Sequence, residues 1–118
     1  MTIKIAGSRT AMATYYGSRG AHIGATTGAP GSTATPANEL ATGGYARVAT
    51  TWGSASDNGT AASILGSAVV LTVPASTVTH AILASAVSGA NMIDWADITD
   101  TVFNQAGQLV LTPSYAQT

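Results

Sequence analysis

Short runs of alternating apolar and polar residues, separated by glycine, proline or asparagine, recur through this 118-residue chain. In residues 68–73, Val69, Leu71 and Val73 share one face of an extended segment, and Pro74 ends it because proline cannot donate to a sheet ladder. Comparable segments span residues 22–27, 45–52, 77–87, 92–97 and 108–112. Short strands at intervals of roughly 8–12 residues are typical of a β-sandwich or barrel.

The sequence therefore predicts an all-β fold: a compact antiparallel β-sandwich or barrel of about six to seven short strands. Residues 1–19 are expected to form an N-terminal arm or short helix, and residues 20–118 the β-sandwich domain. Residues 2–6 alternate like a strand, whereas Ser8 could cap a helix that Gly17 ends. An arm that docks on a neighbouring molecule would have the same pattern.

Two segments are predicted to be turns or loops. Residues 28–36 hold two prolines and two glycines, which exclude regular structure there. Loops of this length are usually functional or interfacial. Asn58-Gly59 is a strong signal for a tight turn between strands, because both central residues of that turn need a positive φ.

Charged residues are unusually scarce. Asp, Glu, Lys and Arg make up 8% of the chain and the net charge is −1, whereas an average soluble domain is about 25% charged. Surface charge normally keeps soluble proteins apart. The composition favours a protein that lives in an assembly, and the alternative is a soluble monomer with a surface rich in Thr and Ser.

Several classes of partner and cofactor are disfavoured by composition. The four basic residues are dispersed, so they form no cluster for nucleic-acid phosphates. No apolar run approaches the roughly 20 residues that span a bilayer. The chain has no cysteine, which excludes disulfides and cysteine-based metal sites. We expect no nucleic acid, no membrane and no cofactor among its partners.

No catalytic or metal-binding constellation can be assembled from the sequence. The only imidazoles, His22 and His80, lack metal-ligand spacing; His80 is expected in the core or an interface, and His22 at a solvated or interfacial position. Asp94, Asp97 and Asp100 lack the calcium-loop pattern, and the first two point to opposite faces of a strand. We therefore expect no enzymatic activity and no metal.

The functional residues are then contact residues. Trp52 and Trp95 are predicted to be core anchors. Glu39 and Arg47 are a candidate structural pair, because a buried charge without its partner would be costly; the alternative is two exposed charges worth under about 1 kcal/mol. The candidate interface residues are Tyr15, Tyr16, His22, Pro30, Pro36 and Tyr45.

Parts of the chain resemble a family of small tailed-phage virion proteins, variously labelled tail fibre, minor capsid or head decoration. In that family a "GLHTGDPG"-like stretch precedes "ANE…GGSYAR", and a "TVTH" segment leads to a strand that contains tryptophan. The matching residues here are Gly28, Pro30, Gly31, Ala37, Asn38, Glu39, Gly43, Gly44, Tyr45, Ala46, Arg47, Thr77, Val78, Thr79, His80 and Trp95. The chain departs from the family at Ala29, where the family has Asp, and at Ala96, where it has Gly.

The resemblance implies a β-sandwich in the virion. The first residues lack the long apolar stretch of a signal peptide, so we expect the protein to be made in the host cytoplasm. Our first expectation is a capsid decoration protein on the outside of the head, which binds the major capsid protein and copies of itself as a cyclic homo-oligomer, with a trimer expected first. The alternative is a tail-fibre or baseplate component that contacts the host surface, with a glycan as partner and surface aromatics such as Tyr45 as stacking platforms.

Overall fold

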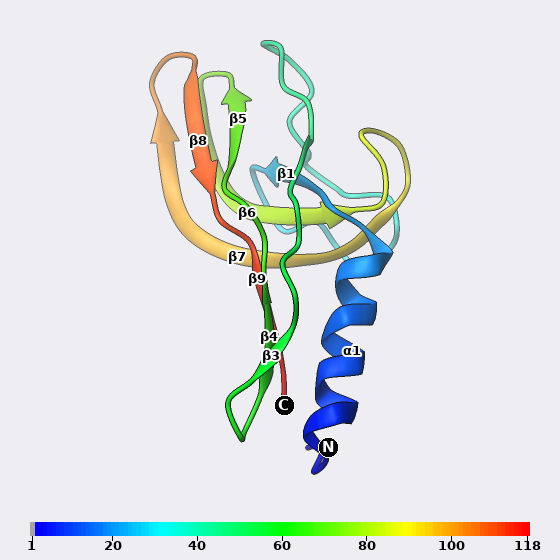
Figure 1. The fold of residues 1–118 in the computed structure, drawn as a ribbon. Coiled ribbons are helices and arrows are strands. Elements are labelled where there is room, and N and C mark those ends of the chain that lie inside the picture. The colour runs from blue at the N-terminus through cyan, green and yellow to red at the C-terminus, as the bar shows by residue number, and fades with distance from the viewer. Residues whose placement is uncertain (1) are drawn as a thin grey trace.

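The computed structural model describes residues 2–118. In this range the chain forms one helix and nine strands (Figure 1). They are α1 (Ala6–Arg19), β1 (His22–Thr26), β2 (Val48–Ala49), β3 (Ser56–Asp57), β4 (Ala62–Leu65), β5 (Val69–Val73), β6 (Ser76–Ala84), β7 (Met92–Phe103), β8 (Gly107–Leu111) and β9 (Ser114–Gln117). The predicted all-β class with a short N-terminal helix is confirmed.

Every strand pairing is antiparallel. A four-stranded sheet has the order β2-β1-β6-β7, a three-stranded sheet the order β3-β4-β9, and β5 pairs with β8 alone. Because β4 leads into β5 and β8 leads into β9, the last two sheets form one bent ribbon of two chain segments. Figure 1 shows this ribbon running from the β5–β8 end to the C-terminus, with the long β6–β7 hairpin crossing it.

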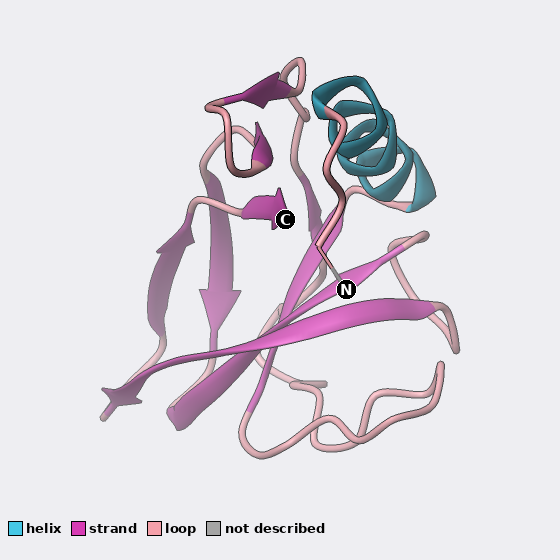
Figure 2. Cartoon of the chain, turned by 90° about the horizontal axis from the view of Figure 1, so that it is seen from below, coloured by secondary structure: helices cyan, strands magenta, loops and turns pink. Residues whose placement is uncertain are grey.

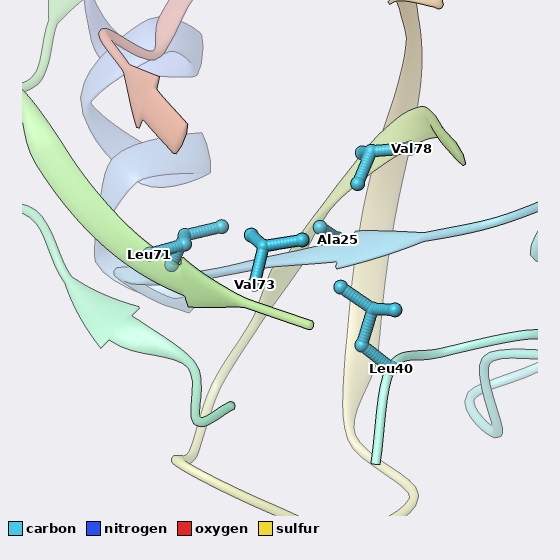
Figure 3. Packing of buried hydrophobic residues seen from close by; sticks show 5 residues of the cluster. All are labelled: Ala25, Leu40, Leu71, Val73 and Val78. Atoms are coloured by element: carbon cyan, nitrogen blue, oxygen red, sulfur yellow. The ribbon is translucent and has the colours of Figure 1, made fainter. Parts of the chain in front are cut away.

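The alternating segments bury one face each, as their period requires. In β5, Val69, Leu71 and Val73 are buried while the residues between them are exposed. Leu71 and Val73 meet Ala25, Val78 and Leu40 in a core cluster between β5, β1 and β6 (Figure 3). This cluster holds the two layers of the sandwich together.

The helix packs against the far end of the ribbon. Ala13 of α1 is buried with Ala62 and Ile64 of β4 in a second cluster. Figure 2, viewed from below, shows the helix beside the short strands of the three-stranded sheet. Across the described residues, α1 is neither long nor apolar enough to cross a bilayer.

The predicted helix boundaries are wrong at both ends. Residues 2–5 form no strand, and the helix begins at Ala6, where the Ile5 carbonyl accepts from the Ser8 and Arg9 amides. Ser8 thus lies inside the helix. Gly17 lies inside the helix too. A side chain at this position would press on Trp52 and Ile64, so close packing, and not a turn, explains why the residue is glycine.

Strand lengths also differ from the prediction. Of residues 45–52 only Val48–Ala49 forms a strand, and Trp52 makes an isolated bridge to Gly66. The side chains of Tyr45 and Arg47 belong to a polar network described below. The strand predicted at 92–97 continues to Phe103. The sequence analysis missed three short strands, β3, β4 and β9, because two to four residues are too few for a period of two to be recognised.

The predicted Asn58-Gly59 turn is present in a looser form. Asp57 pairs with Ala62, so four residues connect β3 to β4. Gly59 has a φ of 95°, but Asn58 is not among the residues with positive φ. The Asn58 carboxamide instead accepts from the amides of Thr60 and Ala61 and closes the loop.

Candidate functional site

A cleft of about 320 Å³ opens between the β6–β7 hairpin and the β8–β9 segment, beside the C-terminal half of α1. The lining is mainly apolar and aromatic. Its residues are Tyr16, Ile23, Trp52, Ala81, Ile82, Leu83, Asp94, Trp95, Ala96, Ile98, Leu111, Thr112, Pro113, Ser114 and Tyr115. Its volume lies at the lower end of the roughly 300–1,000 Å³ range of ligand pockets.

Aromatic rings from three separate chain segments meet at this cleft. Tyr16 of α1 stacks on Tyr115 of β9, with ring centroids 3.7 Å apart and planes 6° apart. Trp52 packs its ring edge-to-face with Tyr16 at 6.4 Å and donates its indole N–H to the Gly20 carbonyl. The stacked pair and Trp52 therefore form a fixed wall.

Trp95 is 40% exposed, and its side chain lies on the other face of β7 from Asp94, because consecutive residues of a strand point to opposite faces. Its indole Nε1 donates to the Gly31 carbonyl at 2.9 Å, and its ring makes an edge contact with His80 at 5.2 Å. These two contacts hold the ring in place on the exposed strand β7. The prediction that Trp95 is a core anchor is wrong, because β7 is the edge strand of its sheet and residues 94–97 are exposed.

Asp94 is the charged residue of the cleft lining among the described residues. One carboxylate oxygen accepts from the Tyr16 hydroxyl at 2.7 Å and the other from the Trp95 amide at 2.9 Å. Burial, followed by the hydrogen bond to this carboxylate, raises the pKa of Tyr16 well above its ordinary value. The hydroxyl therefore stays protonated and keeps donating at any physiological pH.

A second surface feature is the outer face of the β5–β8 pair, which we call the uncharged face. It consists of the exposed residues Val70, Thr72, Gln108 and Val110. Val70 and Val110 lie directly opposite each other and are 46% and 60% exposed. The four strands of the bent ribbon contain no Asp, Glu, Lys or Arg.

Glu39 and Arg47 are in contact, as the sequence suggested. Arg47 binds both carboxylate oxygens of Glu39 at 2.8 Å, and its side chain is only 2% exposed. Its remaining N–H groups donate to the Ala86 and Gly89 carbonyls and to Asn91 Oδ1. All five guanidinium donors are therefore used.

Tyr45 extends this network into the core. Its hydroxyl donates to Glu39 at 2.7 Å and accepts from the Ala25 amide at 3.0 Å. Burial raises the pKa of Glu39, but the hydrogen bonds from Arg47 and Tyr45 outweigh it and leave the pKa below its ordinary value. Tyr45 is half-buried and its hydroxyl is engaged, which argues against the expected role as an exposed stacking platform.

Sequence reasoning missed a second buried ion pair. Arg9 of α1 donates to both carboxylate oxygens of Asp57 in β3, at 2.6 and 2.8 Å, and to the Ile3 carbonyl at 2.7 Å. Arg9 is 5% exposed. The available signal was the scarcity of charge itself, but nothing in the spacing of Arg9 and Asp57, 48 residues apart, pairs them.

The remaining interface candidates are divided between the surface and the interior. Tyr15 is 61% exposed, and its neighbour Tyr16 points into the cleft, so the two tyrosines face different ways as expected. Pro36 and His22 are partly exposed. Pro30 is fully buried, and its carbonyl accepts from the Ala37 amide; the internal packing of the 28–36 loop removes its side chain from any interface.

No group of three or more His, Cys, Asp or Glu residues that could hold a metal ion occurs within residues 2–118. His80 Nδ1 lies 2.7 Å from the Thr79 hydroxyl, and His80 Nε2 lies 3.9 Å from Asp97. The arrangement at His80 thus consists of one hydrogen bond to a hydroxyl and one longer contact with a carboxylate.

One comparison with known proteins gives a match. The model of a family described as Podophage GP4 fiber I protein gp80 matches residues 9–113. The matched range begins inside α1 and includes β1 to β8, so it takes in the Glu39–Arg47 network and most of the cleft. No curated protein and no solved structure matches the chain.

Proposed function

This chain belongs to the podophage GP4 fiber I protein gp80 family, and from that premise we propose that it is a subunit of a fibre on the phage particle. Membership confirms the resemblance to phage virion proteins and gives the chain a structural role in the virion. The observation that carries the finer proposal is the family's description as a fibre protein, which covers residues 9–113.

The physical argument for assembly rests on the uncharged face. Val70 and Val110 expose apolar surface on a two-stranded sheet that carries no charge. Burying such a surface against a second copy leaves no ionised group without a partner, so the desolvation cost is small. Many weak contacts of this kind, repeated by symmetry, sum to firm attachment. We propose copies of this chain as the first partner, with a trimer as the expected state.

Head decoration is the second candidate. The low charged fraction and the neutral β surface suit a protein that covers the outer capsid and contacts the major capsid protein. The same surface chemistry suits a fibre, so the family description decides the order of the two candidates.

Labelling of intact particles separates them. Gold-conjugated antibody raised against the purified chain is applied to whole virions and viewed by electron microscopy. We expect label on fibres. Label spread evenly over the head would overturn the fibre proposal in favour of decoration, and particles without label, despite a positive immunoblot of the same lysate, would overturn both.

A further inference from the structure

We propose that residues 2–5 of one copy add as a strand to the open edge of β7 in the next copy, and so join subunits head to tail. The inference rests on the proposed fibre role and deepens it, because it names the two surfaces that make a contact along the fibre. It combines three observations: a strand-like segment without a strand partner, an open edge beside an apolar cleft, and complementary charges.

Residues 2–5 have the sequence pattern of a strand but lie outside every strand of the described chain. Polar residues alternate with isoleucine, and the backbone at Ile5 is extended, with φ −100° and ψ 121°. The Ile3 and Ile5 carbonyls accept from Arg9 and from the first turn of α1. The Lys4 backbone makes no hydrogen bond within residues 2–118. Because successive residues of an extended chain direct their N–H and C=O groups to opposite sides, one side of this segment is used and the other is open.

The segment cannot reach β7 of its own molecule. Ile5 adjoins the first residue of α1, a helix of 14 residues that is therefore about 21 Å long. Tyr16, near the other end of α1, is the residue that contacts Asp94 of β7. In Figure 1 the start of α1 lies at the lower end of the molecule, and β7 crosses above it. Ile5 is 66% exposed and Lys4 is exposed, so both side chains can meet a second copy.

The edge of β7 matches the segment in length and in pattern. Within the described sheet β7 pairs with β6 alone, and the backbones of Ala96, Asp97 and Ile98 make no hydrogen bond outside that pairing. Ala96 and Ile98 line the apolar cleft, whereas Asp97 does not, because it points to the other face of the strand. An added strand of four residues spans about 13 Å, which is enough to lie along residues 94–98.

The two alternations agree when the isoleucines of the added strand lie on the cleft side. Ile3 and Ile5 then extend the apolar lining beside Ala96. Lys4 points to the opposite face of the sheet, where the Asp97 side chain is 78% exposed. In strand additions of this kind the main-chain hydrogen bonds provide the affinity, and the alternating side chains fix the register.

Charge favours this edge over the other open edges. The acidic residues outside the two buried ion pairs are Asp94, Asp97 and Asp100, and all three lie on β7. Carboxylates along an edge disfavour its pairing with a second β7 strand. Lys4 is one of two basic residues outside the buried pairs, and the other, Arg19, lies at the far end of α1. The strands of the bent ribbon carry no charge that could attract Lys4.

The contact joins two different surfaces, so it can repeat from copy to copy. Such a heterologous contact builds an open filament unless its rotation closes a ring. The uncharged face, by contrast, is the contact that we propose for the closed oligomer. The two contacts together give a fibre that is several chains wide and grows along its axis.

Carbodiimide coupling of the full-length, unmodified chain tests the contact. The reagent joins an amine to a carboxylate that lies against it, and Lys4 is the single lysine of the sequence. Isotope-labelled and unlabelled chains are mixed in equal amounts, so that mass spectrometry recognises links between two copies. We expect a mixed-isotope link between Lys4 and a carboxylate of β7, with Asp97 as the main site.

Three results of the coupling would overturn the proposal. The first is a set of mixed-isotope links that join Lys4 to carboxylates outside β7. The second is an associated protein that gives no Lys4 link. The third comes from coupling on purified virions: links from Lys4 to peptides of a different protein would make that protein the partner of residues 2–5.

Charge reversal provides a second test, with sedimentation velocity as the measurement. Lys4→Glu should need a concentration at least about tenfold higher to form species larger than the closed oligomer. Arg19→Glu makes the same change at the exposed far end of α1 and is the matched control. Asp97→Lys should be weakened like Lys4→Glu. An equimolar mixture of these two variants should recover the larger species, because every contact in an alternating filament then joins opposite charges.

Equal assembly by Lys4→Glu and Arg19→Glu, or a mixture that assembles no better than its parts, would contradict the proposed contact. Neither result would move the gold label on the virion, so the fibre role would stand. Gold label on the head together with a Lys4–Asp97 link would do the reverse: the fibre role would fail, and the contact would join copies on the capsid.

Discussion

Charged side chains are few in this chain, and four of them tie distant segments together in two buried pairs. Arg47 and Glu39 join the long loop after β1 to the turn between β6 and β7, through Ala86, Gly89 and Asn91. Arg9 and Asp57 join the helix to β3. With so little charge elsewhere, each pair has few competing partners, so the pairs specify how the loop and the helix are placed.

Replacing Glu39 with Gln should lower the free energy of unfolding by about 3 kcal/mol. The substitution leaves the Arg47 guanidinium buried without a countercharge, and breaking a buried pair in this way costs about 3–5 kcal/mol. Urea denaturation followed by tryptophan fluorescence measures the change. Asp100→Asn, which removes an exposed carboxylate, is the control and should change stability by less than about 0.5 kcal/mol. Equal urea midpoints for the two variants would show that the Glu39–Arg47 network does not stabilise the fold.

Acid should weaken the attachment of the helix. The hydrogen bonds from Arg9, and then from the Gly59 amide, lower the pKa of Asp57 from 3.8 to about 2. A carboxyl with a lowered folded-state pKa stabilises the fold above its unfolded pKa, and that contribution is lost as the pH falls through the folded value. We therefore expect stability to fall between about pH 4 and about pH 2.

The variant Asp57→Asn isolates this effect. It should be less stable than the unmodified chain near neutral pH, and the difference should shrink across the same acid range because both proteins then lack the carboxylate. Denaturation curves at several pH values measure it. A difference that stays constant down to pH 2 would assign the acid response to other groups.

At the scale of single residues, the sequence predicted well where chemistry limits the choices. Glu39 and Arg47 could be singled out because buried charge needs a partner, and Trp52 does contact two core clusters. The sequence could not predict the exposure of Trp95 or the burial of Pro30, nor that Tyr16 and Tyr115 stack beside the cleft. Their burial depends on which strand lies at a sheet edge and on how a loop folds back, and neither is encoded in local spacing.

At the scale of elements, two glycines at the ends of the helix differ in whether their surroundings leave room for a side chain. Gly20, just after α1, lies so close to the Ala84 backbone that an added Cβ would meet its carbonyl group. Gly7, in the first turn, has nothing within 4 Å of that position. The first glycine is required by the close approach of helix end and β6, whereas the second is not required by any contact.

Alanine at each position tests this reading. Gly20→Ala should destabilise by about 1–3 kcal/mol through overpacking. Gly7→Ala should stabilise by about 0.5–1 kcal/mol, because alanine has the better helix propensity. Thermal unfolding by circular dichroism compares the two variants. If both variants melt alike, the contact between the helix end and β6 does not constrain the fold.

The element boundaries show what alternation can and cannot predict. Residues 69–73 and Pro74 were predictable because period-two burial and a proline stop act within one strand. The short strands β3, β4 and β9 were missed because they depend on partners across the bent ribbon. Ile82 and Leu83 of β6 are both buried although they point to opposite faces, because this interior strand is covered on both sides: Ile82 lies near Tyr45 and Arg47, and Leu83 packs with Ile23 and Val69.

At the scale of the whole molecule, the chain is elongated, with extents of 47 × 24 × 21 Å. Its helix start and C-terminal strand lie at one end and the β5–β8 pair at the other (Figure 1). The uncharged face thus projects at one end of the long axis, where it can meet a neighbour.

A charge placed on that face should prevent self-association. Val110→Asp would bury an unpaired carboxylate in the proposed contact and should weaken association at least about tenfold. Ala90→Asp adds the same charge in an exposed turn at the far end of the β6–β7 hairpin and is the matched control. Sedimentation velocity over a range of concentrations measures both. Unchanged association in Val110→Asp would place the contact elsewhere.

The most direct test of the fibre account is a cryo-electron-microscopy reconstruction of the intact virion, searched with this chain. The account predicts density for several copies along a fibre, with the β5–β8 face buried between neighbouring copies. Density for the chain on the head surface, or copies in a fibre with that face turned to solvent, would contradict it.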